Sequence, residues 1–328
     1  MKRLSTILLS ALCIALAAGT GSAQDKYPSK PVKIIVPYAP GGATDIVSRF
    51  LGEHMGRILG QQFVTENKPG AFGIVGIEEM ARARPDGYTL FIGNVTTNAI
   101  TPTVHAKKFS INYERDVVPV ARLVDIPAFI VVSKDFAPKT LAEVVALAKQ
   151  SKGKVRYGHV GVGSYPHYDT EVFSRRAGIE MNAIPNKAGA SGVLKDMATG
   201  DVQVAFLNVA SAKPMIKAEQ IRPVALINPT RLPEYPDVPT IAEAGYPGVG
   251  TLAWQGLFAP AGTPKEVLEI LSRTVLQALE VPEVKETFGK QYFNIVPSKS
   301  LEEAKKWLQD EIALWKKVTD EVKIELTE

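Results

Sequence analysis

The chain carries near its start the stretch Lys33-Ile34-Ile35-Val36-Pro37-Tyr38-Ala39-Pro40-Gly41-Gly42-Ala43-Thr44-Asp45, followed by Ile46-Val47-Ser48-Arg49-Phe50-Leu51. The short apolar run at its beginning predicts a buried strand. Two prolines stop this strand, because neither has an N–H for the sheet. Gly41 and Gly42 can then adopt backbone angles closed to other residues. Thr44 or Asp45 is expected to cap a helix that follows.

A helix that begins after such a loop presents free N–H groups and the positive end of its dipole. This arrangement binds anions. The patterns G-x-G-x-x-G and G-K-[ST] are both absent from the chain, which argues against a nucleotide. Since strand-loop-helix junctions with glycine occur throughout α/β proteins, the stretch predicts an anion site without naming its ligand.

Residues 1–23 are predicted to be a signal peptide that directs export to the periplasm. Lys2 and Arg3 precede an apolar run from Leu4 to Ala18, and Gly21-Ser22-Ala23 supplies small residues for cleavage. The only cysteine of the chain, Cys13, lies in this segment, so no disulfide is expected in the mature protein.

The charge of the chain does not favour nucleic acid as a partner. The formal net charge is +4, and loss of Lys2 and Arg3 with the signal peptide leaves +2 on about three hundred residues. The composition, 45% hydrophobic and 22% charged, is that of a globular protein long enough for two domains.

Beyond the signal peptide, apolar strands alternate with helices, and a polar or glycine-rich loop follows each strand. Such loops begin at Tyr38, Asn94, Gly158, Pro185 and Asn208. The alternation predicts α/β domains with mainly parallel sheets. In such sheets a ligand binds beyond the carboxyl ends of the strands, where all five loops are expected to lie.

Besides binding, these loops could carry three kinds of chemistry. Ser164 and His167 could belong to an exported serine hydrolase, although the pattern G-x-S-x-G is absent. A metal site would need His159, His167, Asp169 and Glu171, whose spacing is unlike that of zinc ligands. Lys187 could form a Schiff base, but a solvated lysine is far commoner. The loops therefore favour a binding module, without catalytic residues, metal or cofactor.

Six short motifs, in order, resemble the Bug-type substrate-binding proteins of tripartite tricarboxylate transporters, along essentially the whole mature chain. They are Tyr27-Pro28-Ser29-Lys30-Pro31-Val32, residues 36–45 quoted above, Glu66-Asn67-Lys68-Pro69-Gly70-Ala71, Pro85-Asp86-Gly87-Tyr88-Thr89-Leu90, Pro236-Asp237-Val238-Pro239-Thr240 and Ala259-Pro260-Ala261-Gly262-Thr263-Pro264.

The resemblance implies a type II periplasmic binding protein, a monomer that closes two α/β domains around a small carboxylate. The expected ligand is a dicarboxylate, aliphatic or aromatic, delivered to the membrane permease of the transporter. The ligand-binding residues that the resemblance implies are Tyr38, Ala39, Gly41, Gly42, Thr44, Asp45, Thr97, Ser164, His167, Asn186 and Asn208.

Three departures from the family pattern leave the identity of the acid open. Asn186 stands in Pro185-Asn186-Lys187-Ala188 where many relatives have Pro-Tyr-Lys-Gly. Leu207 replaces the aspartate of a frequent Phe-Asp-Asn, and Gln255 replaces an aromatic residue beside Trp254. The side of the site that selects the rest of the ligand is therefore expected to differ.

The same resemblance places the domain boundaries. The first domain is expected to comprise residues 24–122 and 229–328, and the second domain residues 123–228. The crossing segments would lie near Leu123 to Pro127 and Val224 to Asn228, and a terminal helix from Leu301 to Val318 would pack back on the first domain.

Overall fold

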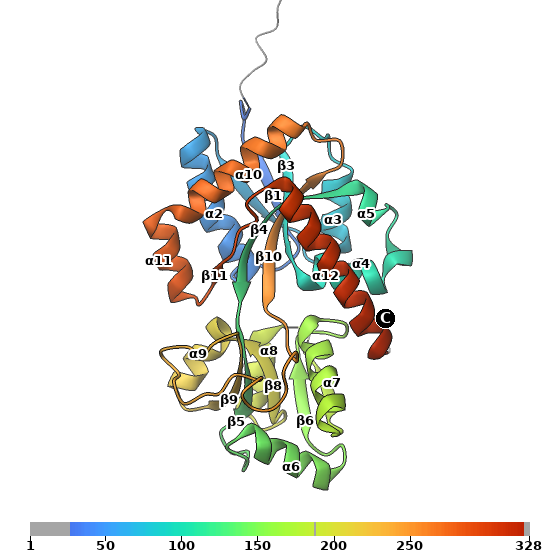
Figure 1. Ribbon diagram of the computed structural model, residues 1–328, viewed down its shortest axis with the longest axis vertical. Coiled ribbons are helices and arrows are strands. Elements are labelled where there is room, and N and C mark those ends of the chain that lie inside the picture. The colour runs from blue at the N-terminus through green and yellow to red at the C-terminus, as the bar shows by residue number, and fades with distance from the viewer. Residues whose placement is uncertain (1–26, 187, 325–328) are drawn as a thin grey trace, which may run out of the picture.

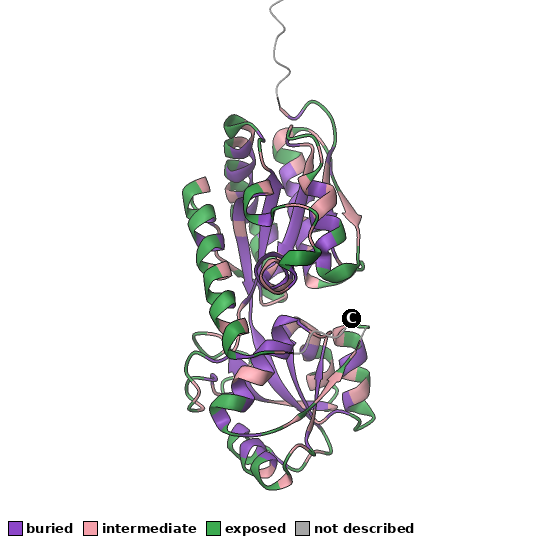
Figure 2. Cartoon of the chain, turned by 90° about the vertical axis from the view of Figure 1, so that its right-hand side faces the viewer, coloured by how far each residue is buried: buried purple, intermediate pink, exposed green. Residues whose placement is uncertain are grey.

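The computed structural model describes residues 27–186 and 188–324 and shows two α/β domains, one above the other in Figure 1. The expected signal peptide and Lys187 lie outside the described residues. Each domain has its own sheet, and the buried residues gather in these two layers (Figure 2).

The first domain is built on a six-stranded sheet covered by helices on both faces. Its strands, in sheet order, are β11 (Asn294–Ile295), β4 (Val117–Ile126), β10 (Ala253–Pro260), β3 (Thr89–Asn94), β1 (Val32–Val36) and β2 (Phe63–Asn67). Its helical segments are α2 (Ala43–Leu59), η1 (Ala71–Gly73), α3 (Ile74–Ala81), η2 (Thr96–Ile100), α4 (Thr101–Val104), η3 (Ala106–Lys108), α5 (Tyr113–Asp116), α10 (Lys265–Glu280), α11 (Pro282–Lys290) and α12 (Leu301–Glu321).

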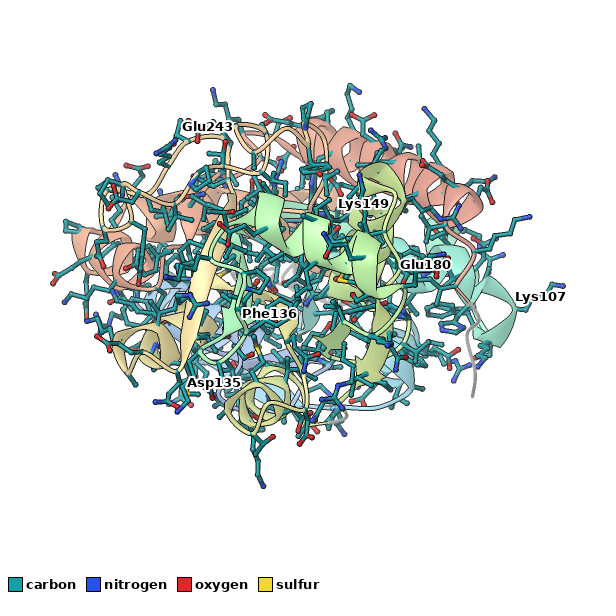
Figure 3. All side chains as sticks on the ribbon, turned by 90° about the horizontal axis from the view of Figure 1, so that it is seen from below. Lys107, Asp135, Phe136, Lys149, Glu180 and Glu243 are labelled. Carbon is teal, nitrogen blue, oxygen red and sulfur yellow. The ribbon has the colours of Figure 1, made fainter. Side chains whose placement is uncertain are left out.

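The second domain has a five-stranded sheet. Its strands, in sheet order, are β7 (Asn182–Pro185), β6 (Arg156–His159), β8 (Val204–Asn208), β5 (Ala128–Ser133) and β9 (Ile221–Ile227). Its helices are α6 (Leu141–Ser151), α7 (Tyr165–Ala177), α8 (Ala190–Ala198) and α9 (Val209–Lys217). Seen from below, Asp135, Lys149, Glu180 and Glu243 point to solvent around this domain (Figure 3).

Both sheets are mixed. The strand-helix units are parallel: β1 pairs with β2 and β3, and β6 with β7 and β8. The strands next to the domain junction, β4, β5, β9 and β10, pair antiparallel with their neighbours. The chain enters the second domain along β4 and β5 and returns to the first along β10, so β10 runs antiparallel to β4.

The first crossing lies at Pro127, between β4 in one sheet and β5 in the other. The second crossing lies later than the expected Val224 to Asn228. Residues after β9 stay in the second domain, where Ile241 and Val249 join its core and Thr240 pairs with Leu226. The chain returns to the first sheet only at β10. The second domain therefore continues to about residue 250, because these apolar side chains need its core.

Helix α12 packs on the first domain, as the sequence predicts. Ser300 caps it by accepting a hydrogen bond from the N–H of Glu303, and the Glu303 carboxylate accepts the N–H of Lys299 in return. Trp307 and Trp315 are buried in the first-domain core, and Trp254 of β10 contacts Trp307 edge-on. Trp254 and Trp307 therefore pack against each other, and all three tryptophans belong to the first-domain core.

Candidate functional site

The strand register shows which ends of the sheets meet at the junction. β10 starts at the second crossing and runs antiparallel to β3, so that Gln255 pairs with Asn94 at the carboxyl end of β3. β5 starts at the first crossing, and Ala128 pairs with Asn208 at the carboxyl end of β8. The strands parallel to β3 and β8 end on the same side. Six strand ends, and the helices that follow them, therefore face the junction (Figure 1).

The glycine loop after β1 opens the first of these helices. Gly41 has a φ of +90° and Gly42 is the N-cap of α2. Both glycines and Ala39 are exposed, and a Cβ atom at either glycine would meet no atom within 4 Å. The first N–H groups of α2 are therefore open to a ligand, as an anion site requires.

The Asp45 side chain fixes the conformation of this loop through hydrogen bonds. Its carboxylate accepts hydrogen bonds from the N–H of Gly41 at 2.9 Å, from Nε of Arg49 at 3.1 Å and from Nδ2 of Asn67 at 2.9 Å. Burial alone would raise the pKa of Asp45, but these hydrogen bonds outweigh it and lower the pKa below its ordinary value.

The expected helix cap was wrong in detail. Gly42, rather than Thr44 or Asp45, is the N-cap, and no side chain caps α2 there. Asp45 is the third residue of the helix and reaches back to the loop, while Thr44 is buried. The Asp45 carboxylate therefore fixes the loop, and its negative charge does not favour an anion beside it.

The loop after β3 is organised by Asn94. Its Oδ1 atom accepts hydrogen bonds from the Tyr38 hydroxyl at 2.9 Å, from the N–H of Thr96 at 3.0 Å and from the N–H of Thr97 at 3.3 Å. Thr97 is fully buried, and its hydroxyl is bonded to Asn94 and Asn98. Thr97 thus stabilises the loop, while Tyr38 and Thr96 are half-buried at its surface.

In the second domain, Ser164 and His167 lie at the start of α7. The Ser164 hydroxyl donates to the carbonyl of Gly161 at 2.7 Å, and the N–H of Gly163 donates to Nδ1 of His167 at 3.2 Å. The His167 ring stacks on His159 at 4.0 Å. Burial, and then the neighbouring His159, lower the pKa of His167 to about 3. His167 is therefore neutral, with its proton on Nε2, and can donate a hydrogen bond.

This geometry does not support the serine hydrolase. The Ser164 hydroxyl is directed to a backbone carbonyl instead of His167, and Nδ1 of His167 is occupied by a backbone N–H. In the described part of the chain, no carboxylate hydrogen-bonds to His167 to orient it as a base.

Tyr165, which the sequence analysis did not single out, joins the two halves of the junction. Its hydroxyl donates to Oδ1 of Asn208 at 2.6 Å, and its N–H donates to the Thr96 hydroxyl of the first domain at 3.3 Å. Tyr165 and Tyr168 also belong to the first-domain core. The first turn of α7 therefore packs directly against the other domain. The only sequence signal for this is an aromatic residue directly after Ser164.

Asn186 is held inside its own loop. Its Nδ2 atom donates to Asp196 at 2.7 Å, and its Oδ1 atom accepts the N–H of Ala188 at 2.9 Å. A Cβ atom at Gly192 would lie only 1.9 Å from Oδ1 of Asn186, so this side chain requires a glycine there. Asn186 therefore shapes the start of α8. Residues 27–186 and 188–324 contain no group of three His, Cys, Asp or Glu side chains placed to hold a metal ion.

Asp169 ties α7 to the second crossing. Its carboxylate accepts the N–H of Thr251 at 2.9 Å and the Thr251 hydroxyl at 2.7 Å. Asp169 is buried, and this burial raises its pKa to about 7 in spite of the two hydrogen bonds.

This raised pKa predicts a pH effect on stability. Between the unfolded pKa near 4 and about 7, the folded protein holds a proton that the unfolded chain has lost, so stability falls as the pH rises. Asp169→Asn keeps an acceptor for the N–H of Thr251 and removes the buried charge. We expect this variant to melt above the wild type at pH 8, and the difference to vanish near pH 4. A constant difference across this range, measured by calorimetry, would contradict the assignment.

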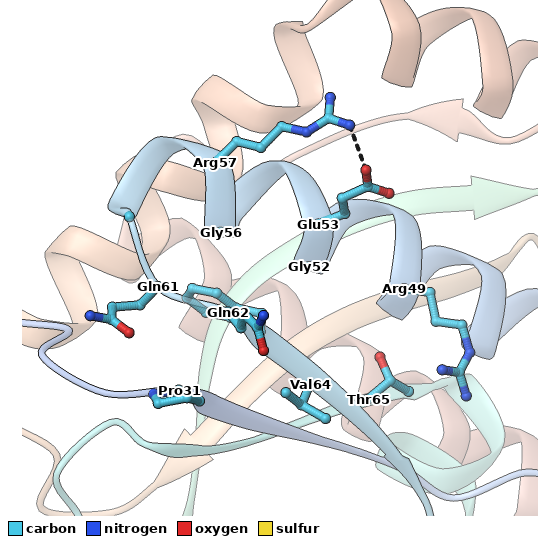
Figure 4. A pocket seen from close by; sticks show the side chains of 12 residues that line it. Pro31, Arg49, Gly52, Glu53, Gly56, Arg57, Gln61, Gln62, Val64 and Thr65 are labelled. Carbon is cyan, nitrogen blue, oxygen red and sulfur yellow. Dashed lines mark hydrogen bonds and ion pairs between the residues drawn. The ribbon is translucent and has the colours of Figure 1, made fainter.

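A groove of about 950 Å³ lies away from the junction, between α2 and the edge strand β2 (Figure 4). Its charged side chains are engaged with one another: Arg57 pairs with Glu53 and Glu283, and Arg49 with Asp45. Gly52, which lines it, permits close packing of α2 on Phe63. The charged side chains of the groove are thus engaged within the protein, and the groove lies away from the strand ends that face the junction, so the junction remains the candidate site.

No helix among the described residues has the length and hydropathy of a membrane span. The family model TctC, described as "Tripartite tricarboxylate transporter family receptor", matches residues 47–324. The chain belongs to this family.

The similarity to other members of this receptor family extends over almost the whole chain. Protein BugT of Bordetella pertussis is 30% identical over 321 residues, covering 98% of each chain. The R. palustris protein Rpa4515 with adipate has a TM-score of 0.83 at 31% identity and covers 91% of this chain and 99% of its own. MatC from Rhodopseudomonas palustris with bound malate has a TM-score of 0.79 at 29% identity and covers 89% and 99%.

These likenesses show that the chain is a Bug-type receptor with the two-domain type II fold of periplasmic binding proteins. The family and its solved neighbours are binding proteins, which agrees with the absence of a serine-histidine pair in the geometry of α7.

Proposed function

We propose that the protein is an extracytoplasmic receptor that captures a small dicarboxylate between its domains and hands it to the membrane subunits of a tripartite tricarboxylate transporter. The receptor works in the periplasm as a monomer. It performs no chemistry on its ligand.

The observation that carries this proposal is the open glycine loop at the start of α2. The exposed Gly41 and Gly42 leave the first N–H groups of the helix free, and the start of α7 lies against the same domain at Thr96. Helix N-termini with unpaired N–H groups bind carboxylates. None of the residues expected at the site carries a positive charge, and His167 is neutral. Backbone and neutral donors would therefore hold the anion.

The neighbours support the ligand class. Rpa4515 is described with adipate and MatC with malate, both dicarboxylates, and both cover nine-tenths of this chain or nearly so. In this proposal Tyr38, Ala39, Gly41, Gly42, Ser164, His167 and Asn208 face the ligand, while Thr44, Asp45, Thr97 and Asn186 shape the loops.

The proposal is tested by melting the purified receptor with a panel of mono-, di- and tricarboxylates and with matched esters. At one hundred times the dissociation constant, a ligand stabilises the folded state by about 2.7 kcal/mol. We expect a shift of several degrees for at least one dicarboxylate, and none for its dimethyl ester. Native mass spectrometry of the protein as purified would show any acid that it retains.

The alternatives give other results. Turnover of the esters would support a hydrolase. Absence of a shift with every carboxylate would favour an adhesion or scaffold protein and would contradict the proposed function.

A further inference from the structure

The side-chain amide oxygen of Gln255 is buried without a partner. Gln255 is only 2% exposed, and its Oε1 atom, which is inaccessible, accepts no hydrogen bond from residues 27–186 and 188–324. A buried amide oxygen without a partner lowers the stability of a protein, and buried polar groups are satisfied in nearly all native structures. A group of this kind requires an explanation.

The register places this amide at the candidate site. Gln255 lies on β10 directly opposite Asn94, the last residue of β3. Residues directly opposite each other in an antiparallel pair have side chains on the same face of the sheet, with Cβ atoms about 5 Å apart. The Asn94 side chain accepts the Tyr38 hydroxyl, and Tyr38 begins the loop that leads to α2. Gln255 therefore lies at the junction end of the sheet, on a strand separated only by β3 from β1 and its glycine loop.

The same face carries α2. Ile34 and Leu90 are opposite each other in β1 and β3, and by alternation they share the face of Asn94. Gly52 of α2 approaches the side chain of Ile34, so α2 covers this face. The first N–H groups of α2 and the amide of Gln255 thus lie on the same face of the first sheet, at its junction end, although they come from different elements of the chain.

We infer that Gln255 recognises a hydrogen-bonding substituent, such as a hydroxyl group, on the carbon chain of the bound dicarboxylate. This inference rests on the proposed function. A neutral amide supplies one acceptor and two donors but no charge, so it does not replace the N–H groups as the partner of a carboxylate. It matches a hydroxyl group, which both donates and accepts. A site built to bond a hydroxyl discriminates strongly against the analogue that lacks it.

The test compares acids that differ by one hydroxyl group: malate with succinate, 2-hydroxyglutarate with glutarate, and 2-hydroxyterephthalate with terephthalate. Calorimetry of the wild type should show one hydroxylated acid bound about tenfold or more tightly than its partner. Methionine has a similar length and no amide. Gln255→Met should therefore bring the ratio of the two affinities close to one, chiefly by weakening the binding of the hydroxylated acid.

Two further measurements distinguish ligand recognition by Gln255 from a structural role of this residue. Without ligand, Gln255→Met should melt at or above the wild-type temperature, because it removes a buried amide oxygen that lacks a partner. Gln203→Met is the matched control. The Gln203 amide accepts the N–H of Arg156 at 2.9 Å and donates to the carbonyl of Gly200 at 2.8 Å. Gln203→Met should melt at a lower temperature than the wild type and keep the wild-type ratio of affinities for the two acids.

The failures are distinguishable. If the wild type binds dicarboxylates but prefers none with a hydroxyl group, or if Gln255→Met keeps the preference, the role of Gln255 is overturned and the proposed function stands. If no acid of the panel binds at all, the proposed function fails, and the role of Gln255 fails with it.

Discussion

Replacing Gly42 with valine is expected to abolish ligand binding while the protein stays folded. Gly42 has a φ of −80°, which valine can adopt, and a Cβ atom there would extend into open space. That space is where the proposed carboxylate would accept hydrogen bonds from the start of α2. Hydrogen bonds to a charged group contribute about 1.5–3 kcal/mol each. The loss of two would weaken binding by about a hundredfold or more.

Stability should change little, because valine as N-cap costs about 1 kcal/mol. The matched control is Gly289→Val in α11, also an exposed glycine with no atom within 4 Å of its Cβ position. It should bind normally. Calorimetry with the dicarboxylate found in the panel, and a melting curve of each variant, decide the matter. Normal binding by Gly42→Val would show that the anion site is elsewhere.

The sequence predicted the parts of the site that local rules determine. The β1 strand, the glycine loop and α2 follow from an apolar run, two prolines and two glycines in succession. The loops after β3, β6, β7 and β8 were likewise expected, because alternation of strands and helices brings carboxyl ends to one edge. These features depend on residues close together in the chain.

Features that depend on distant residues were missed. The hydroxyl of Tyr165 bonds to Asn208 and its N–H to Thr96, which lie 43 and 69 residues away, and no local pattern encodes such contacts. The late second crossing has the same cause. Nothing near Asn228 shows that Ile241 and Val249 will pack on the second-domain core. Gln255 departs from the family pattern in the sequence, but only the folded chain shows that its Oε1 atom lacks a partner.

The Asp45 carboxylate could either only cap α2 or hold the whole glycine loop in its conformation. The hydrogen bonds around it support the role in holding the loop. Asp45→Ala would leave the N–H of Gly41 without its acceptor and break the contacts with Arg49 and Asn67. We therefore expect a loss of about 2–3 kcal/mol in the free energy of unfolding, larger than the ~1 kcal/mol of a lost cap.

Binding should weaken together with stability, because the backbone that presents the N–H groups is no longer held. Asp45→Asn is the matched variant. It retains one acceptor, for the N–H of Gly41, and loses the charge and the second oxygen that accepts from Asn67, so it should lose less of both than Asp45→Ala. If Asp45→Ala binds the acid as tightly as the wild type, the network does not shape the anion site.

The pH dependence gives an independent reading of the same network. Since the pKa of Asp45 is lowered in the folded protein, its contribution to stability is present above the unfolded pKa near 4 and is lost as the pH falls through the folded value. The difference between wild type and Asp45→Ala, measured by urea unfolding, should be constant from pH 6 to 8 and shrink below pH 4. A difference that persists at pH 2 would mean that the ionised carboxylate is not what holds Gly41. The loop would then depend on its glycine angles and the Asn67 contact with Tyr38 alone.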